Sequence, residues 1–556
     1  MAGRLIQPER PRDRPGEVRP GGALTWAAMA KRALALDLGS SSVRAIVFEA
    51  DGSGAVEAVE GALARRPRHL LAQEPGQATF DADDYLADLV ACIDELQGRG
   101  CLDGVTEVAA DSQWHSAVAL GPDGAPVSEL LTWADTRSQP RHWACSAGAP
   151  GGEVSRERLE QLRQRTGCAA GPMYWTSKVP WLAERLSGRT GRYLGLSEYV
   201  GLKLLGDPSM SVSMASGTGL LATAEHRWDP EALELAGLEE SGLPPLAPRE
   251  WRGRLAVQWR RRWPELASAL WHPVIGDGAA ANLGVGCDGP GRAALTVGTS
   301  AAVRSVRHAP DPEALPAGLW RYCVDHDRVV VGAAYSSGGQ LYSWALSLWE
   351  GVGSAATGHR SGAATADVPP AVDYDIDEPA PAGSRGVMVM PWHAGTRTPA
   401  APVPAGQGCV TGLGLGHTGA DIVSAAVEAV CFQLAGGLDD LERGAGSRAR
   451  LAVVANGGAI DRSRWWRTRL ASVLGRSLLC PTVPETTARG AASLALGAGP
   501  AMTGRVGGDQ VRVVAPVAAD VAVLADARRR WQQRYDELRP VVAGSGPARV
   551  RAGQGP

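Results

Sequence analysis

Residues 33–48 read ALALDLGSSSVRAIVF, which is an apolar run, a short turn of glycine and serine, and a second apolar run. This pattern around Gly39 predicts two strands joined by a tight turn. Residues 293–306, AALTVGTSAAVRSV, repeat it around Gly298, nearly half of the 556-residue chain further on. One such hairpin is a weak signal, but the pair at this spacing predicts a duplicated α/β domain with a cleft between the two halves.

The rest of the chain fits two domains between irregular ends. Short β-rich runs alternate with helical stretches, as is typical of α/β proteins. Residues 351–384 are irregular and rich in Gly, Ala and Pro, and we expect a surface insertion there. The expected division is a disordered tail over 1–31, a first domain over 32–290, a second domain over 291–535 and a tail over 536–556.

Composition excludes several classes of protein. The net charge of −3 argues against a nucleic-acid binder. Lysine occurs only at Lys31, Lys178 and Lys203, and none lies in a G-x-x-x-x-G-K-[ST] loop or a V-A-I-K strand, which excludes P-loop and protein-kinase phosphate sites. The nine cysteines form no C-x-x-C pair, which favours a reduced, cytoplasmic compartment. No apolar run approaches the roughly 18 residues that are needed to span a bilayer, so we expect no membrane as a partner.

Both turns have the chemistry to bind phosphate. A turn of glycine and hydroxyl residues exposes consecutive backbone N–H groups and hydroxyls, so it holds phosphate oxygens without a lysine. Two such turns can hold a polyphosphate between them. The candidate phosphate-binding residues are Gly39, Ser40, Ser41, Gly298, Thr299 and Ser300.

The two hairpins differ at the end of the first strand, where one has Asp37 and the other Thr296. A carboxylate beside a phosphate loop repels the phosphates unless a hard cation lies between them. Mg²⁺ bound by one or two carboxylates and by phosphates is the usual arrangement. Asp37 is therefore the expected ligand on the metal side.

A second carboxylate follows a short strand in residues 273–286, PVIGDGAAANLGVG. Asp277 stands where a helix of small residues begins, and an aspartate there is often a plain helix N-cap. A carboxylate at the end of a strand can also accept the proton of an attacking hydroxyl, as phosphoryl transfer to an alcohol requires. This segment alone leaves both roles open.

Residues 451–475, LAVVANGGAIDRSRWWRTRLASVLG, predict a strand, a turn at Gly457 and Gly458, and a helix. A glycine pair at the start of a helix lets a flat or anionic ligand approach the backbone. The same pair also suits an ordinary strand-to-helix turn.

Polar and aromatic residues are interleaved in residues 111–115 and 131–137, just after strand-like runs. Such residues suit a polyol, which is held by hydrogen bonds and packed against a ring. The candidates for binding such a substrate are Trp114, His115, Asp135, Arg137, Tyr174 and Lys178.

Taken together and in order, these segments resemble the FGGY family of carbohydrate kinases over about residues 32–505. The resemblance implies two ribonuclease-H-like domains of the actin-like ATPase fold, with ATP and Mg²⁺ bound in the cleft between them. It identifies Asp277 as the general base and as a second residue on the metal side with Asp37. The adenosine site that it implies consists of Gly457, Gly458 and Arg462. One departure is Thr396, which stands where the family usually has a glutamate.

Within the family, several stretches look most like gluconate kinases, among them 114–116, 130–137 and 211–221. This likeness implies phosphorylation of D-gluconate to 6-phosphogluconate, with Asp277 also contacting the substrate. Because gluconate is an anion, its site should offer a cation, and Lys178, Arg137 and His115 are the candidates.

Two other functions stay open at this point. The substrate can be xylulose or another polyol. Alternatively, the actin-like fold serves chaperone ATPases and filament proteins, which need no sugar. The polar and aromatic run around Trp114 argues against this second function. A homodimer also stays open.

Overall fold

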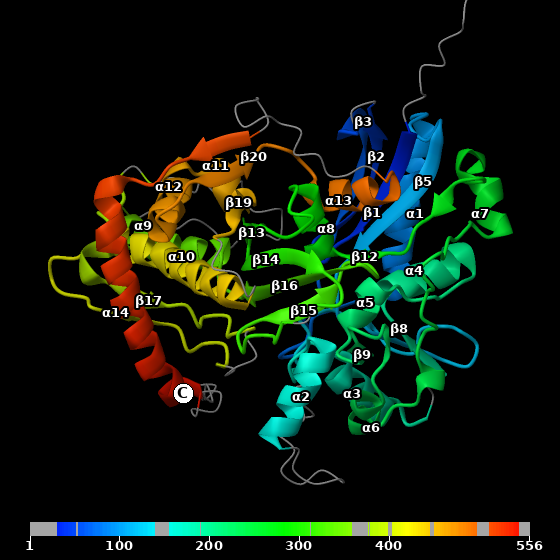
Figure 1. Cartoon of the computed structure of the whole chain (residues 1–556), viewed down its shortest axis with the longest axis horizontal. Coiled ribbons are helices and arrows are strands. Elements are labelled where there is room, and N and C mark those ends of the chain that lie inside the picture. The colour runs from blue at the N-terminus through cyan, green and yellow to red at the C-terminus, as the bar shows by residue number, and fades with distance from the viewer. Residues whose placement is uncertain are drawn as a thin grey trace, which may run out of the picture.

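The computed structural model describes residues 31–51, 54–138, 155–188, 191–311, 313–357, 376, 378–397, 403–444, 450–497 and 511–543. Two mixed sheets form its framework, one in each half of the chain (Figure 1).

The first sheet contains the predicted N-terminal hairpin. Its strands are Lys31–Leu38 (β1), Ser42–Ala50 (β2), Val56–Pro67 (β3), Val105–Ser112 (β5), Leu270–Trp271 (β11) and Ile275–Gly276 (β12). The order is β11-β5-β1-β2-β3, and β12 also pairs with β5. β1, β2 and β3 are antiparallel, whereas β5 runs parallel to β1 and to both β11 and β12.

The second sheet repeats this plan. Its strands are Arg292–Val297 (β13), Ala301–His308 (β14), Trp320–Cys323 (β15), Arg328–Tyr335 (β16), Ala452–Asn456 (β19), Leu478–Pro481 (β20) and Val511–Val514 (β21). β13, β14 and β16 are antiparallel like β1, β2 and β3, and β19 is parallel to β13 as β5 is to β1. The predicted duplication is therefore confirmed.

Helices surround the two sheets (Figure 1). The longer ones are Ala82–Gly98 (α1), Gly339–Thr357 (α9), Gly419–Gly444 (α10), Arg464–Leu474 (α12) and Ala518–Ala543 (α14). α1 packs against β2 and β3, α10 against β14 and β16, and α14 against α12 and α10. Among the described residues, α10 is the one helix long and apolar enough to cross a membrane, with a mean hydropathy of 1.4, but 83% of its most apolar window is buried in the protein. It therefore serves as a core helix.

Two shorter helices lie where the halves meet, Asp277–Gly284 (α8) and Thr486–Ala495 (α13). They cross closely because both have glycine at the contact: a Cβ on Gly284 would lie 1.7 Å from the Thr486 carbonyl oxygen, and one on Gly490 would lie 1.9 Å from that of Ala280. α13 comes from the second half but packs on the first sheet, beside β1 and β5 (Figure 1). The start of α8 is thereby fixed between the two sheets.

The remaining elements are short and lie mainly in insertions of the first half. They are the strands Thr79–Phe80 (β4), Val118–Leu120 (β6), Leu130–Leu131 (β7), Arg192–Leu194 (β8), Leu221–Ala222 (β9), Arg227–Trp228 (β10), Met388–Met390 (β17) and Cys409–Thr411 (β18), the helices Arg156–Thr166 (α2), Trp175–Leu186 (α3), Leu196–Leu205 (α4), Val212–Ser216 (α5), Pro230–Ala236 (α6), Val257–Arg262 (α7) and Gly458–Arg462 (α11), and the 3-10 turns Glu240–Gly242, Pro264–Leu266 and Ser384–Gly386.

Three predicted boundaries differ from the structure. β1 begins at Lys31, inside the predicted tail 1–31, and α9 continues to Thr357, inside the predicted insertion 351–384. α14 continues to Ala543, although a tail was expected from residue 536. The tail prediction rested on the aperiodic end of the chain, rich in Pro, Arg and Gly, whereas the helix is held by one face at helical spacing, Leu524, Ala527 and Trp531, and its last turns continue beyond that contact. Residues 1–30, 358–375 and 544–556 lie outside the described residues.

Candidate active site

Three carboxylates stand at the same edge of the first sheet. β1, β5 and β12 are neighbouring parallel strands, so their carboxyl ends meet at one edge. Asp37 and Asp111 are paired in register, and Asp111 is also level with Ile275, two residues before Asp277. Sequence analysis predicted Asp37 and Asp277 as site residues but did not select Asp111, because the order of strands in a sheet is set by contacts distant in the sequence.

Burial and mutual repulsion raise the pKa values of this cluster. Burial raises the pKa of Asp37 to about 6; the guanidinium of Arg44, 3.5 Å from its Oδ2 atom, offsets part of the rise, and the charge of Asp277 adds to it. Burial and the charge of Asp37 raise the pKa of Asp111 well above its ordinary value. Such carboxylates gain from a cation, which would release their protons.

Asp277 is the first residue of α8, and Gly276, not Asp277, occupies the N-cap position. Its Oδ1 atom accepts one hydrogen bond, from the N–H of Gly278 at 2.7 Å. Burial raises its pKa, and the charges of Arg304 and Arg397 act in the opposite direction. The side chain is thus a partly buried base rather than the conventional cap of its helix.

Buried polar atoms without hydrogen-bond partners gather at the strand ends of both sheets. Within the described residues they include both polar side-chain atoms of Gln113 in the first half, where the carboxylate oxygens of Asp111 accept no hydrogen bond and its protonated carboxyl group can donate one to Asp37. In the second half they include Thr296 Oγ1 and Asn456 Oδ1, on two residues that are paired in register just as Asp37 and Asp111 are. Buried polar atoms are normally satisfied, so these indicate a polar ligand between the halves.

The two predicted phosphate turns lie at these strand ends. Gly39 follows β1, and its carbonyl oxygen accepts a hydrogen bond of 2.9 Å from the hydroxyl of Tyr85, while Ser40 is half-buried and Ser41 exposed. The second turn contains Gly298, Thr299 and Ser300. Its Gly298 carbonyl oxygen accepts a bond of 2.7 Å from the N–H of Gly339, which begins α9, and Thr299 is exposed. Each turn is anchored while its hydroxyl residues stay accessible.

The predicted adenosine segment forms a strand-to-helix turn after β19. Gly457 has φ of 98°, which favours glycine, and a Cβ there would lie 2.6 Å from the Val297 carbonyl oxygen. The turn therefore lies against the end of β13, directly before Gly298. Gly458 begins α11, and the Nε atom of exposed Arg462 donates to its carbonyl oxygen at 3.1 Å.

Trp114 lies directly against the start of α8. Its ring occupies the space beside Gly276 and Gly278, where added Cβ atoms would come within 1.8 Å and 2.8 Å of it. Its Nε1 atom donates to the Ser213 carbonyl oxygen at 2.9 Å. The ring is also 4.8 Å from the ring of Tyr322, on β15 of the second half. Trp114 therefore links both halves to the segment that carries Asp277.

His115 and Lys178 are buried together. His115 has φ of 70°, its Nδ1 atom lies 2.5 Å from the Gly217 carbonyl oxygen, and burial lowers its pKa to about 3. The ring is thus neutral, with its proton on Nδ1, and Nε2 is left as an acceptor. The ammonium of Lys178 donates to the carbonyl oxygens of His115 and Thr132 at 2.8 and 2.6 Å. Lys178 therefore ties together the two loops that were predicted to bind the substrate.

Asp135 and Arg137 form a separate cluster of hydrogen bonds. Asp135 is buried and accepts bonds from the N–H of Ala78 and from the Nε atom of Arg137, both at 3.0 Å. Arg137 also pairs with Glu74 at 2.6 Å. The cations predicted to hold a substrate carboxylate, Lys178 and Arg137, are thus already engaged, and His115 is neutral.

Tyr174, at the N-cap of α3, contacts the second half through its hydroxyl, which lies 2.9 Å from that of Tyr322. Tyr322, Trp320 and Arg304 come from strands of the second hairpin region, and Arg397 comes from the loop after β17. These four residues were not predicted because every sugar candidate chosen from the sequence lies in the first domain. The arginine in the mostly apolar run 301–306 was a signal that could have been used.

The carboxylates fit a magnesium ion only in part. Among the residues that the structure describes, no group of three or more His, Cys, Asp or Glu side chains is arranged to hold a metal ion. Mg²⁺ takes one or two carboxylates and completes its shell with water and phosphate oxygens. The orphaned oxygens of Asp111, beside Asp37, are suitable donors for an ion that arrives with a nucleotide.

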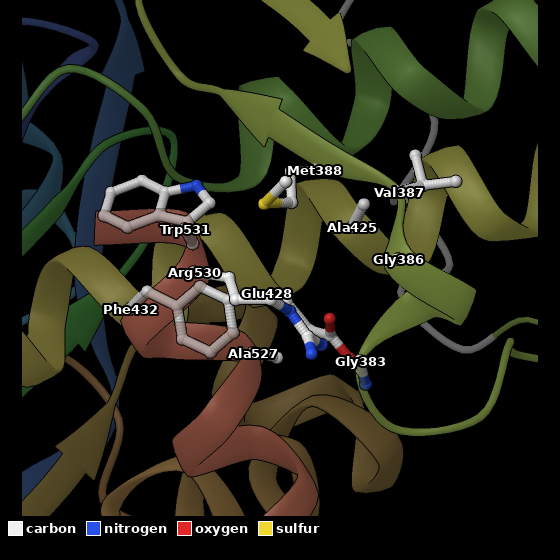
Figure 2. A pocket seen from close by; sticks show the side chains of 10 residues that line it. All are labelled: Gly383, Gly386, Val387, Met388, Ala425, Glu428, Phe432, Ala527, Arg530 and Trp531. Carbon is white, nitrogen blue, oxygen red and sulfur yellow. Dashed lines mark hydrogen bonds between the residues drawn. The ribbon is translucent and has the colours of Figure 1, made fainter. Parts of the chain in front are cut away.

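Two cavities contain none of the predicted site residues. The smaller, of about 10 Å³, lies between α10, α14 and the turn before β17 (Figure 2). Its one acidic residue, Glu428, accepts bonds from the N–H of Gly383 and the hydroxyl of Ser384, both at 2.9 Å, and pairs with Arg469. This cavity has room for about one water and is structural. The other, of about 190 Å³, borders β5 and α13.

Comparison with known proteins gives matches along most of the chain. The N-terminal domain model of the FGGY family of carbohydrate kinases matches residues 32–258, and the C-terminal domain model matches residues 293–498. A gluconokinase from Bacillus subtilis (strain 168) is 26% identical over 478 residues, which cover 83% of this chain and 86% of that protein. A xylulose kinase from Streptomyces rubiginosus is 28% identical over 465 residues, covering 81% and 85%.

Among solved structures, that of a gluconate kinase from Lactobacillus acidophilus is similar, with a TM-score of 0.75 and 22% identity over 93% of this chain and 99% of that one. This likeness confirms the predicted duplicated, actin-like fold. The relatives differ in the sugar after which they are named, so the comparisons define the class of substrate more firmly than the individual sugar.

Proposed function

Because the chain belongs to the FGGY family of carbohydrate kinases, which use ATP to phosphorylate hydroxyl groups, we propose that it phosphorylates D-gluconate to 6-phosphogluconate. The single observation that supports this reaction best is the edge of the first sheet, where Asp37, Asp111 and Asp277 lie together at the ends of neighbouring strands. A cluster of carboxylates beside a turn of glycine and hydroxyl residues suits a magnesium–nucleotide complex and a base for an alcohol.

Asp277 is the proposed general base. The terminal hydroxyl of the sugar donates its proton to this carboxylate as its oxygen attacks the γ-phosphorus in line with the leaving ADP. Burial raises the pKa of Asp277, which makes the ionised carboxylate a better proton acceptor than an exposed aspartate. The bond from the Gly278 N–H holds Oδ1, which leaves Oδ2 as the proposed proton acceptor.

The hairpin turns are proposed to hold the phosphates, and Gly457, Gly458 and Arg462 the adenosine. Asp37 and Asp111 would hold the magnesium ion, with Asp277 close by. Such an ion neutralises charge on the phosphate oxygens during transfer. Arg44, which pairs with Asp37 and with Glu485 at 2.5 Å, keeps the carboxylate of Asp37 in place across the two halves.

The aromatic residues are proposed to form the sugar side of the site. Trp114 provides a flat apolar face beside Asp277, and the Nε2 atom of neutral His115 can accept a bond from a sugar hydroxyl. Lys178, Asp135 and Arg137 would act by positioning the loops that carry these groups, and Tyr174 by joining them to Tyr322.

Gluconate is proposed over xylulose because the sequence resembles gluconate kinases at several substrate-side stretches, and because relatives with that name are found by sequence and by structure. Xylulose is the second candidate, since a relative named for it has similar identity. The family match removes the basis for a chaperone or filament function without sugar. We also propose a cytoplasmic location; a homodimer remains an untested prediction.

Thermal denaturation tests the proposal without requiring turnover. In the presence of a non-hydrolysable ATP analogue and Mg²⁺, D-gluconate should raise the Tm of the protein by several degrees, because a ligand that binds only the folded state stabilises it. D-xylulose and glycerol serve as matched controls. A larger Tm shift with D-xylulose than with D-gluconate would contradict the choice of substrate. If none of the sugars changed the Tm, the proposed kinase site itself would be contradicted.

A further inference from the structure

Two arginines of the second half lie beside Asp277 without partners of their own. Arg304 is on β14, and Arg397 is in the loop after β17. Among the residues that the structure describes, neither guanidinium has a hydrogen-bond or ion-pair partner, and the Nε atom of Arg304 is buried. Both side chains are half-buried, and a half-buried guanidinium without a hydrogen-bond partner in the protein has donors left for an anionic ligand.

The position of Arg304 is built into the backbone on both sides. A Cβ on Gly332, its register partner on β16, would lie 3.0 Å from Arg304 Cγ. A Cβ on Gly278, in the first turn of α8, would lie 3.0 Å from its Nε atom and 2.8 Å from the Trp114 ring. Two glycines therefore leave the space through which this side chain passes from the second sheet to the sugar side of Asp277.

Arg397 is held on the same side by an aromatic ring. Its guanidinium carbon lies 3.7 Å from the ring centroid of Trp133, within the polar and aromatic run 131–137. It is close enough to His115 to help lower the pKa of that ring, and close enough to Arg304 for the two positive charges to repel each other. Stacking fixes the guanidinium plane without using its N–H donors.

The charges in this region do not balance. Asp277 is the one acidic group that acts on both arginines, and His115 is neutral. With Asp277 ionised, one positive charge remains uncompensated. A neutral polyol would leave this positive charge uncompensated, whereas a sugar acid supplies a carboxylate that compensates it. Guanidinium groups bind carboxylates through paired N–H donors.

We propose that Arg304 and Arg397 bind the carboxylate of a sugar-acid substrate and thereby select sugar acids over neutral polyols. This inference rests on the proposed function and deepens it. It assigns acid recognition to the second half, whereas the base belongs to the first, so the substrate itself bridges the halves. The phosphates are proposed to bind at the two hairpin turns, and among the described residues no hydrogen bond or ion pair joins either arginine side chain to those turns.

The test compares D-gluconate with D-glucitol, which has the same carbon chain and no carboxylate. Wild type, Arg304→Met, Arg397→Met and the control Arg385→Met, whose arginine pairs with Asp421 far from the site, are assayed for the KM of each sugar and of ATP. Each site substitution should raise the gluconate KM by about 10- to 100-fold, as expected for loss of a charge-assisted hydrogen bond. The ATP KM, the glucitol kcat/KM and all constants of the control should change less than about threefold.

Arg304→Lys and Arg397→Lys should recover part of the gluconate affinity. Unfolding is measured in parallel without ligand: removing an unpaired buried charge should leave the Tm unchanged or raise it, whereas a structural role would lower it. An unchanged gluconate KM overturns the inference, and so does a parallel rise in the ATP KM, which would assign the arginines to phosphate. A wild type that phosphorylates only neutral sugars contradicts the proposed function instead, and is recognised before any variant is made.

Discussion

The two halves of the molecule share a backbone plan and differ in the side chains at matching positions. At the ends of β1 and β5 the first half has Asp37 and Asp111, whereas at the ends of β13 and β19 the second has Thr296 and Asn456. Both pairs stand in register on neighbouring parallel strands. The first half therefore presents an acidic edge to the cleft and the second an uncharged polar edge.

This difference shows how a duplicated fold divides the work of one reaction. Two acidic edges would repel a polyphosphate, and two uncharged edges would supply neither a base nor a ligand for a cation. The second half instead contributes Arg304 and Arg397. Removing a carboxylate from the acidic edge, or adding one to the uncharged edge, should therefore lower kcat or raise the ATP KM.

The largest expected effect comes from neutralising the base of the acidic edge. Asp277→Asn keeps the shape of the side chain and its bond from the Gly278 N–H but removes proton acceptance. We expect kcat to fall by about 10²–10⁴-fold, with a smaller change in the ATP KM. Steady-state kinetics of ADP release measure both constants. As a control, Asn282→Asp combined with Asp277→Asn places a carboxylate later in the same helix and should not restore kcat. An unaltered kcat in Asp277→Asn alone would leave Asp277 with only a structural role.

The acidic edge should also make the ligand-free protein less stable as pH rises. The pKa of Asp37 is raised to about 6 in the folded state, so the folded protein binds this proton more tightly than the unfolded chain does. The stabilisation that this proton gives the folded state is complete below the ordinary aspartate pKa of about 4 and is lost as pH rises through about 6. The free energy of unfolding should therefore fall by on the order of 3 kcal/mol.

Urea denaturation between pH 4 and pH 7 measures this dependence, and the free energy of unfolding of wild type minus that of Asp37→Asn isolates the contribution of this carboxyl. This difference in the free energy of unfolding should decrease as pH rises from 4 to 7, because only wild type loses the stabilising proton. A difference independent of pH would show that the carboxylate is already compensated within the protein.

A smaller effect is expected when the second edge is made acidic. Thr296→Asp gives the second hairpin the residue of the first, and at an effective dielectric constant of about 20 the added carboxylate would repel a nearby phosphate charge by on the order of 2 kcal/mol. The ATP KM should rise by about 10- to 30-fold. Thr296→Asn is the uncharged control. If both variants have the same ATP KM, the second edge does not face the phosphates.

The sequence predicted the parts of this arrangement that depend on local pattern. Both hairpins, the turn at Gly457 and the strand end before Asp277 follow from apolar runs broken by glycine, and the structure contains each of them. The separation of the halves followed from repetition. These features need only the residues within a few positions of one another.

Features that depend on distant contacts were not predicted. Asp111 joins the cluster only because β5 lies between β1 and β12, and Arg304 reaches the first half only through the space left by Gly278 and Gly332. Lys178 was singled out for its rarity as a cation for the substrate, but its burial and its bonds to two loop carbonyl groups could not be read from its neighbours in the sequence. Which cation faces the substrate is decided by folding, not by residue type.

The most direct test of the central claim is the rate of ADP release by the purified protein with ATP, Mg²⁺ and one sugar at a time. We expect the highest kcat/KM with D-gluconate, a lower value with D-xylulose and D-glucitol, and little ADP release without sugar. Faster release with a neutral sugar than with D-gluconate, or release that ignores every added sugar, would contradict it.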